Sequence, residues 1–61
     1  MKIKQYDSVL LKDGREGAVI EVNSETNFDI DVGGSPEDWE TLWGVKIDEI
    51  EKVIKQEKAN H

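Results

Sequence analysis

Carboxylates are the side chains of this sequence whose spacing is suited to chemistry. Asp29 and Asp31 alternate with apolar residues in the stretch 28–32, so in a strand they would lie on one face, about 7 Å apart. Glu21 would join them from a neighbouring strand. Three such carboxylates could bind a basic side chain, hold a divalent cation or act as a glycosidase-like acid–base pair; otherwise they form a solvated face.

The metal and the acid–base interpretations of these carboxylates have little support. The stretch lacks the D-x-D-x-D-G spacing of a calcium loop. A chain of 61 residues has little room for the apolar cleft that raises the pKa of a catalytic carboxyl group. We therefore expect no metal here, and two interpretations stay open: a patch for a basic partner and a plain solvated face.

A second acidic cluster surrounds a tryptophan. Trp39 lies between Asp38 and Glu40, shortly after Pro36. Tryptophan is enriched among the residues that dominate binding at protein interfaces. Alternatively, Trp39 covers one open end of a thin core. The candidate partner-binding residues are therefore Glu21, Asp29, Asp31, Glu37, Asp38, Trp39 and Glu40.

No nucleophile with a neighbouring base is visible in the sequence. Cysteine is absent, and the single histidine, His61, ends a polar tail. The pair Gly33–Gly34 lacks the lysine that follows the glycines of a phosphate-binding loop. We expect no catalytic residues, no cofactor and no metal, and hence a protein that is not an enzyme.

Acidic residues outnumber basic ones, and their distribution is uneven. The chain has 14 acidic and 8 basic residues, a formal net charge of -6. Residues 16–45 hold eight of the acidic residues and no basic one. The basic residues of the preceding segment, residues 1–15, are Lys2, Lys4, Lys12 and Arg15. Such a field repels nucleic acids and acidic membranes and attracts basic partners. Alternatively, the charge only keeps a small protein soluble.

The elements that must position these residues are short strands. A chain of this length forms one domain with a thin core. Hydrophobic alternation predicts strands over 6–11, 17–22, 28–32 and 41–47, with a tight turn at Gly14. The residues expected to face inward are Val9 and Leu11; Ala18, Ile20 and Val22; Phe28, Ile30 and Val32; and Trp43, Val45 and Ile47.

The end of the chain admits two structures. Residues 48–58 have the spacing of a helix that begins with a capping box. The alternative is a 3₁₀ turn over 48–50 followed by a strand over 51–54, which we favour because an exposed sheet edge needs a covering strand. The predicted fold is all-β: a five-stranded SH3-like barrel over residues 1–54, with a charged, fraying tail over 55–61.

Two segments carry a resemblance to known proteins. Residues 7–22, with alternating apolar residues around Gly14 and Gly17, resemble the KOW-type opening of an SH3-like barrel. Residues 45–54 are similar to the closing segment of small bacterial barrels of unassigned function. KOW-type domains commonly bind RNA or ribosomal and transcription partners through loop lysines and arginines. The corresponding loops here also carry Asp13, Glu16 and Glu25, which weakens any phosphate contact.

Three functions follow as hypotheses. In the first, a non-enzymatic acidic protein binds a basic protein surface through its carboxylate-rich face, as an inhibitor, an antitoxin or a phage-type modulator of a nucleic-acid enzyme. In the second, a KOW-like accessory domain contacts RNA or the translation or transcription machinery through its basic N-terminal segment. In the third, the chain is a generic structural domain. We expect a cytoplasmic protein that contacts no membrane, and an edge strand that pairs with a second copy would make it a homodimer.

Overall fold

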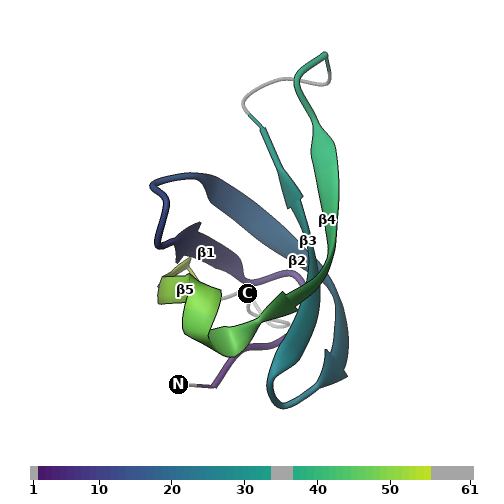
Figure 1. The fold of residues 1–61 in the computed structure, drawn as a ribbon, viewed down its shortest axis with the longest axis vertical. Helices are drawn as coiled ribbons and strands as arrows, with labels where there is room; N and C mark the ends of the chain where they lie inside the picture. The colour runs from purple at the N-terminus through teal and green to yellow at the C-terminus, as the bar shows by residue number, and fades with distance from the viewer. Residues whose placement is uncertain (1, 34–36, 56–61) are drawn as a thin grey trace, which may run out of the picture.

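Five antiparallel strands form one sheet in the computed structural model, which describes residues 2–33 and 37–55 (Figure 1). The spatial order of the strands is β4-β3-β2-β1-β5. The prediction of an all-β chain with a 3₁₀ turn before its last strand is confirmed, and the helix over 48–58 is wrong for residues 48–55. The elements are β1 (Ser8–Leu11), β2 (Glu16–Ser24), β3 (Asn27–Val32), β4 (Glu40–Lys46), the 3₁₀ turn η1 (Ile47–Glu49) and β5 (Ile50–Lys55).

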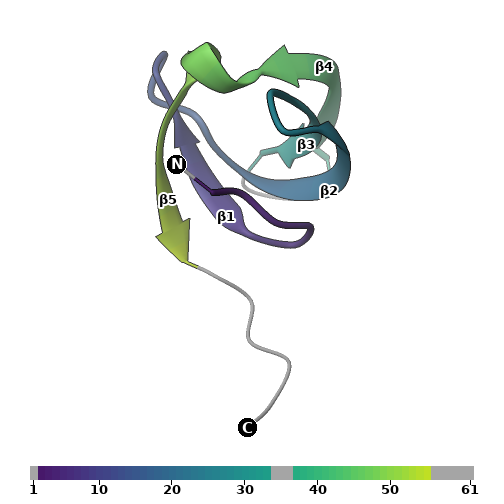
Figure 2. The same ribbon diagram turned by 90° about the horizontal axis from the view of Figure 1, so that it is seen from below.

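The sheet curves around its core but does not close into the expected barrel (Figure 2). Within the described residues no ladder joins β4 to β5, so these two strands are the edges of the sheet. The chain leaves β4 through η1, and the Lys12 N–H donates to the Glu49 carbonyl at 2.9 Å, which brings β5 to the free edge of β1. The fifth strand therefore covers β1 and leaves β4 exposed. Of the predicted tail, Lys55 ends β5 and residues 56–61 lie outside the described part.

Two strands present the faces that alternation predicts. In β1, Val9 and Leu11 are buried. In β3, Phe28, Ile30 and Val32 are buried and the intervening aspartates are only half-buried. The core also includes the N-terminal Ile3, which alternation did not select; the full set of buried apolar residues is Ile3, Val9, Leu11, Val19, Phe28, Ile30, Val32, Val45 and Ile50.

The inward face of β2 differs from the prediction. Val19 is fully buried, whereas Ala18 and Val22 are exposed. The ladder pairs Val19 with Ile30 and Glu21 with Asp29, so β2 holds one extra residue, Ile20, between the two pairs. This β-bulge interrupts the alternation, which allows Val19 to be buried while Glu21 is exposed.

A second bulge reverses the predicted face of β4. Trp43 was expected in the core with Val45, but its exposed fraction is 73%, and Leu42 packs against the core instead. The ladder pairs Leu42 with Ile30 and Val45 with Phe28, so two residues of β4 face one residue of β3. Gly44 is the extra residue and has a φ of +68°, a conformation that L side chains rarely adopt.

Gly17 is required by close packing between β2 and β3. A Cβ atom at this position would lie 2.5 Å from the Asp31 carbonyl oxygen and 2.7 Å from a methyl group of Ile30. No real Cβ atom approaches a backbone oxygen so closely. Glycine at position 17 therefore lets the second strand pass close to β3 without a side-chain clash.

A buried aspartate organises the turn before β1. Asp7 is fully buried, and its carboxylate accepts a hydrogen bond from the Lys4 N–H at 2.9 Å. The Asp7 carbonyl accepts a hydrogen bond from the Val19 N–H at 2.9 Å, which connects the turn to the buried residue of β2. Tyr6, predicted as part of the first strand, lies in this turn with a φ of +75° and is largely exposed.

Candidate partner-binding face

Both tryptophans are exposed on the side of β4 that points away from the core. The exposed fraction is 62% for Trp39, just before the strand, and 73% for Trp43 within it. Thr41 lies between them in sequence and pairs with Asp31 of β3. We call the surface formed by Trp39, Thr41, Trp43, Asp29 and Asp31 the Trp39–Trp43 face. Alternating burial places the two aspartates on it, because their neighbours in β3 are core residues.

Trp39 lies against the outer surface of the sheet and does not cover the core. It lines a shallow depression with Asp31, Ala18 and Gly33. A Cβ atom at Gly33 would come within 2.9 Å of Trp39 Cδ1, so the indole edge rests on the backbone at the end of β3. The core residues are not among those that line this depression. The alternative that Trp39 closes an open end of the core is therefore wrong.

Asp29 holds the β4 bulge in place. Its Oδ1 atom accepts hydrogen bonds from the Gly44 N–H and from Asn23 Nδ2, both at 2.9 Å. The bulge that exposes Trp43 is thus braced by a side chain of the predicted acidic cluster. Asp29 has a structural role as well as a charge, and its replacement would disturb the position of Trp43.

Asp31 is also anchored within the face. Its Oδ1 atom accepts a hydrogen bond from Thr41 Oγ1 at 2.5 Å, across the β3–β4 ladder. This bond fixes one carboxylate between the two indoles. The result is a face on which the indoles of the β4 segment lie beside the aspartates of β3.

Glu21 lies where the prediction placed it, beside the aspartates. It is exposed and pairs with Asp29 in the β2–β3 ladder. Like charges directly opposite one another destabilise a sheet by a few tenths of a kcal/mol to about 1 kcal/mol, so a cation brought by a partner would relieve this repulsion. In residues 2–33 and 37–55, however, no group of three or more side chains is arranged to hold a metal ion.

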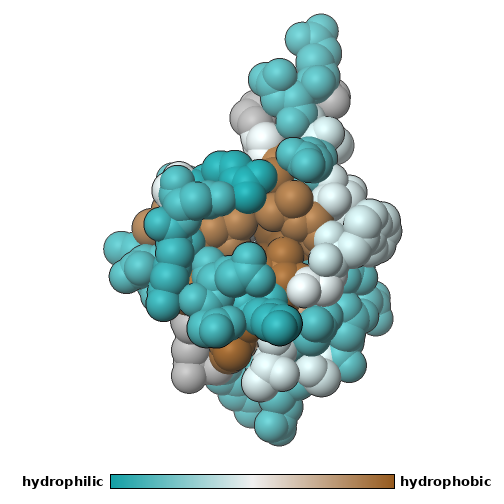
Figure 3. Space-filling view, viewed as in Figure 1, coloured by the Kyte–Doolittle hydropathy of each residue, from teal (hydrophilic) through white to brown (hydrophobic). Residues whose placement is uncertain are grey.

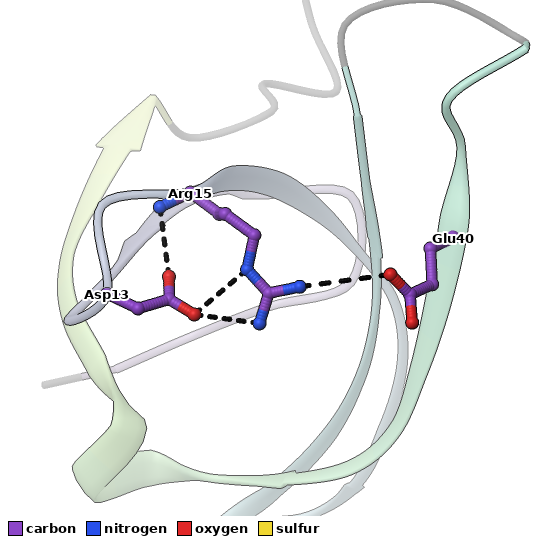
Figure 4. Close-up of polar contacts among 3 residues, drawn as sticks. All are labelled: Asp13, Arg15 and Glu40. Carbon is purple, nitrogen blue, oxygen red and sulfur yellow. Dashed lines mark hydrogen bonds and ion pairs between the residues drawn. The ribbon is translucent and has the colours of Figure 1, made fainter.

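The second acidic cluster is divided between the two sides of β4, because Glu40 pairs with the core residue Val32 whereas Trp39 lies on the outer surface. Glu37, Asp38 and Glu40 are all exposed. Glu40 Oε1 lies 3.9 Å from Arg15 Nη1, and this ion pair joins β4 to the β1–β2 turn (Figure 4). Of the seven predicted residues, the structure therefore brings Asp29, Asp31, Glu21 and Trp39 onto one outer surface. Glu37 and Asp38 precede Trp39, and Glu40 lies on the other side of β4.

Arg15 is held by carboxylates of its own surroundings. Its Nη2 atom lies 2.7 Å from Asp13 Oδ2, its Nε–H donates to the same oxygen at 2.9 Å, and its backbone N–H donates to Asp13 Oδ1 at 3.0 Å (Figure 4). These hydrogen bonds lower the pKa of Asp13 and raise the pKa of Arg15. The one arginine of the chain is thus engaged by acidic side chains, which reduces the positive charge it offers to a phosphate.

A groove lies on the other side of β4, where the sheet fails to close. Apolar residues gather at the centre of this side of the molecule and polar residues surround them (Figure 3). Leu11, Leu42 and Val45 line the groove together with charged residues of the β1–β2 turn and of η1. The edge strand β4 therefore separates an outer aromatic and acidic face from an inner apolar groove.

Trp43 is the main residue of this face that the sequence analysis did not select for binding. Alternation assigned it to the core because Trp43, Val45 and Ile47 have the same parity. The signal that could have corrected this is Gly44: an isolated glycine inside a strand pattern often marks a bulge. A bulge at that position shifts Trp43 to the outer surface.

Comparison of the chain with protein-family models, with curated proteins and with solved structures finds no match in any of the three. What the structure itself supports is a small all-β protein with one five-stranded antiparallel sheet. Within the described residues no helix is long and apolar enough to cross a membrane.

Proposed function

We propose that this protein is a non-enzymatic interaction protein that binds a basic protein surface through the Trp39–Trp43 face. The observation that carries the proposal is the exposure of two indoles on the outer side of β4, beside the anchored carboxylate of Asp31. Indoles combine a large apolar surface with a hydrogen-bond donor, and they attract cations to their faces. A face with indoles and carboxylates suits lysine and arginine side chains, because both kinds of group attract cations.

Charge supports the same partner class. The segment 16–45, which contains β2, β3 and most of β4, has eight acidic residues and no basic one. Such a field steers a basic partner during encounter and suppresses acidic partners. The exposed indoles then supply the short-range contacts, because aromatic anchors contribute most of the binding energy at many interfaces.

A nucleic-acid enzyme is the kind of partner that this charge pattern favours. The groove of such an enzyme is lined by cations that normally contact phosphates. Carboxylates on a small rigid sheet can occupy the same cations, so we propose an inhibitor, an antitoxin or a phage-type modulator. This step rests on charge and size, and a cytoplasmic bacterial setting stays a prediction with it.

We infer in addition that the sheet is an open variant of an SH3-like arrangement with a KOW-like opening. Support comes from the position of β1 between β2 and β5 and from the 3₁₀ turn before β5. Contact with RNA has less support than contact with a basic protein, because Arg15 is engaged by Asp13 and Glu40. Retention on a heparin column at low salt, lost when Lys2, Lys4 and Lys12 are replaced by glutamine, would favour RNA instead.

Charge reversal tests the proposal. Glu21→Lys combined with Glu37→Lys changes two exposed carboxylates at or beside the face and breaks no hydrogen bond among those described above. Asp48→Lys combined with Glu51→Lys makes the same change of net charge on η1 and β5 and serves as the control. We expect the first variant to lose the proteins that the wild type captures from a lysate at low salt, and the control to retain them. Equal capture by both variants would show that bulk charge, and not this face, is responsible.

A further inference from the structure

The outer edge of β4 is available to another strand. β4 ends the ladder, so within the described residues the backbone groups that point away from β3 have no strand partner. Over Glu40, Thr41 and Leu42 the ladder with β3 is regular, and the bulge begins only at Trp43. A short, straight stretch of edge therefore lies between the two exposed indoles.

The other edge of the sheet is less suited to pairing. The β1–β5 ladder has register shifts on both sides of the Val9–Leu10 pairs, so β5 carries two extra residues, Glu51 and Ile54. Bulges twist an edge strand away from an incoming strand and are a common protection against such pairing. Of the two edges, β4 has the longer regular segment beside binding side chains.

The two sides of β4 specify what an added strand would carry. Its outward residues would lie next to Trp39, Thr41 and Trp43, with Asp31 on β3 two strand spacings, or about 9.6 Å, from the added strand, within reach of a long basic side chain. Lysine or arginine at every second position would contact the indoles and the carboxylate. Its inward residues would lie next to Glu40 and Leu42. Beside Leu42, above the groove that Leu11 and Val45 line, an apolar residue suits the inward position.

A second copy of this chain fits the edge poorly. Each copy has a net charge of -6, and β4 itself contributes Glu40 beside the acidic pair Glu37 and Asp38. Two such edges would repel one another, whereas a basic strand would be attracted. Charge therefore favours a partner protein over a homodimer as the occupant of this edge.

We propose that β4 binds an extended segment of a partner protein, in which basic and apolar residues alternate, as a sixth strand of the sheet. The proposal rests on the proposed function and adds the mode of recognition: backbone hydrogen bonds supply affinity, and the indoles with Asp31 select basic side chains. The bulge at Trp43 and Gly44 ends the regular edge, so only a few residues of the segment pair with it.

Backbone methylation of a synthetic peptide tests this mode. The probe is the capped peptide Thr-Arg-Val-Arg-Val-Arg-Thr, and a scrambled peptide with its arginines in one block is the control for charge. In a strand, N–H groups of successive residues point to opposite edges. One variant of the probe is N-methylated at both valines and a second variant at two of the arginines. Binding is followed by tryptophan fluorescence and by amide chemical shifts of residues 40–42.

Strand addition predicts an asymmetric result. The unmodified probe binds more tightly than the scrambled peptide, and one of the methylated variants loses about tenfold or more in affinity, because its blocked N–H groups face β4. The other variant binds as the unmodified probe does. The wild-type protein is used in all the peptide measurements, so none of these outcomes depends on a mutant that fails to fold.

Three results would overturn the proposal. Equal binding by both methylated variants would show electrostatic contact without pairing, and would leave the proposed function standing. Absence of binding by the unmodified probe would eliminate the extended segment as ligand, while the charge-reversal experiment decides on the proposed function separately. A dimer in sedimentation that dissociates on Trp43→Ala would assign the edge to a second copy.

Discussion

Replacement of Trp43 by alanine distinguishes the exposed position of Trp43 in the structure from the buried position that alternation predicts. If Trp43 belonged to the core, as alternation with Val45 predicts, Trp43→Ala would cost about 3–5 kcal/mol of unfolding free energy. With 73% of the residue exposed, only about a quarter of an area of up to roughly 250 Å² is buried. At about 25 cal/mol per Å² this corresponds to at most ~1.5 kcal/mol. We expect a loss of about 1 kcal/mol, because the freed side-chain entropy offsets part of it.

Urea denaturation followed by far-ultraviolet circular dichroism measures this cost, since it does not depend on the tryptophan that is removed. Leu42→Ala is the matched control: the residue precedes Trp43 and packs against the core, so it should cost about 2 kcal/mol or more. A chain of this length has a total stability of only about 3–9 kcal/mol, so the two variants are readily distinguished. If Trp43→Ala cost as much as Leu42→Ala or more, the outward position of Trp43 and the bulge that produces it would be refuted.

Three further predictions follow from other features of the structure. Gly44→Ala should destabilise the protein by about 1–2 kcal/mol through the left-handed backbone alone, since a Cβ there meets Asn27 only at 3.7 Å. Gly44→Asn should cost clearly less, because asparagine tolerates this conformation. Equal costs for the two variants would argue against the bulge geometry. Gly17→Ala should cost more than Gly44→Ala, because its Cβ would overlap backbone atoms of β3, and denaturation midpoints order the two. The pKa of Asp13 is lowered from 3.8 by hydrogen bonds from Arg15. This carboxylate therefore contributes stability above its unfolded pKa, and the contribution is lost as the pH falls through the lower folded pKa. Carboxyl chemical shifts should show the pKa of Asp13 rising towards 3.8 in Arg15→Gln, and an unchanged value would contradict the contact.

Alternation predicted the buried face correctly in β1 and β3, the strands that contain no extra residue at a bulge. In β3, Phe28, Ile30 and Val32 alternate with acidic residues, and a polar residue cannot be buried without a partner, so only one orientation is stable. In β2 and β4 both parities offer apolar residues. Sequence reasoning chose Ala18 over Val19 and Trp43 over Leu42, and each choice was wrong.

The candidate site was predicted in part for the same reason. Asp29 and Asp31 lie on the outer surface as expected, because β3 is regular. Their hydrogen bonds to Gly44 and Thr41 come from β4 and depend on a register that no residue of β3 encodes. Alternation within β3 therefore predicts only their outward position, whereas the structure gives them anchoring roles within the face.

The sequence by itself determined the all-β class, the five-strand count, the 3₁₀ turn before the last strand and the concentration of acidic residues between positions 16 and 45. These are properties of local alternation and composition, and each is readable within a short window of residues. Only the tertiary structure decided that the sheet stays open, that Trp43 joins Trp39 outside and that β4 is an accessible edge. Those properties depend on β-bulges and on strand order, which are set by how distant strands fit together around a common core.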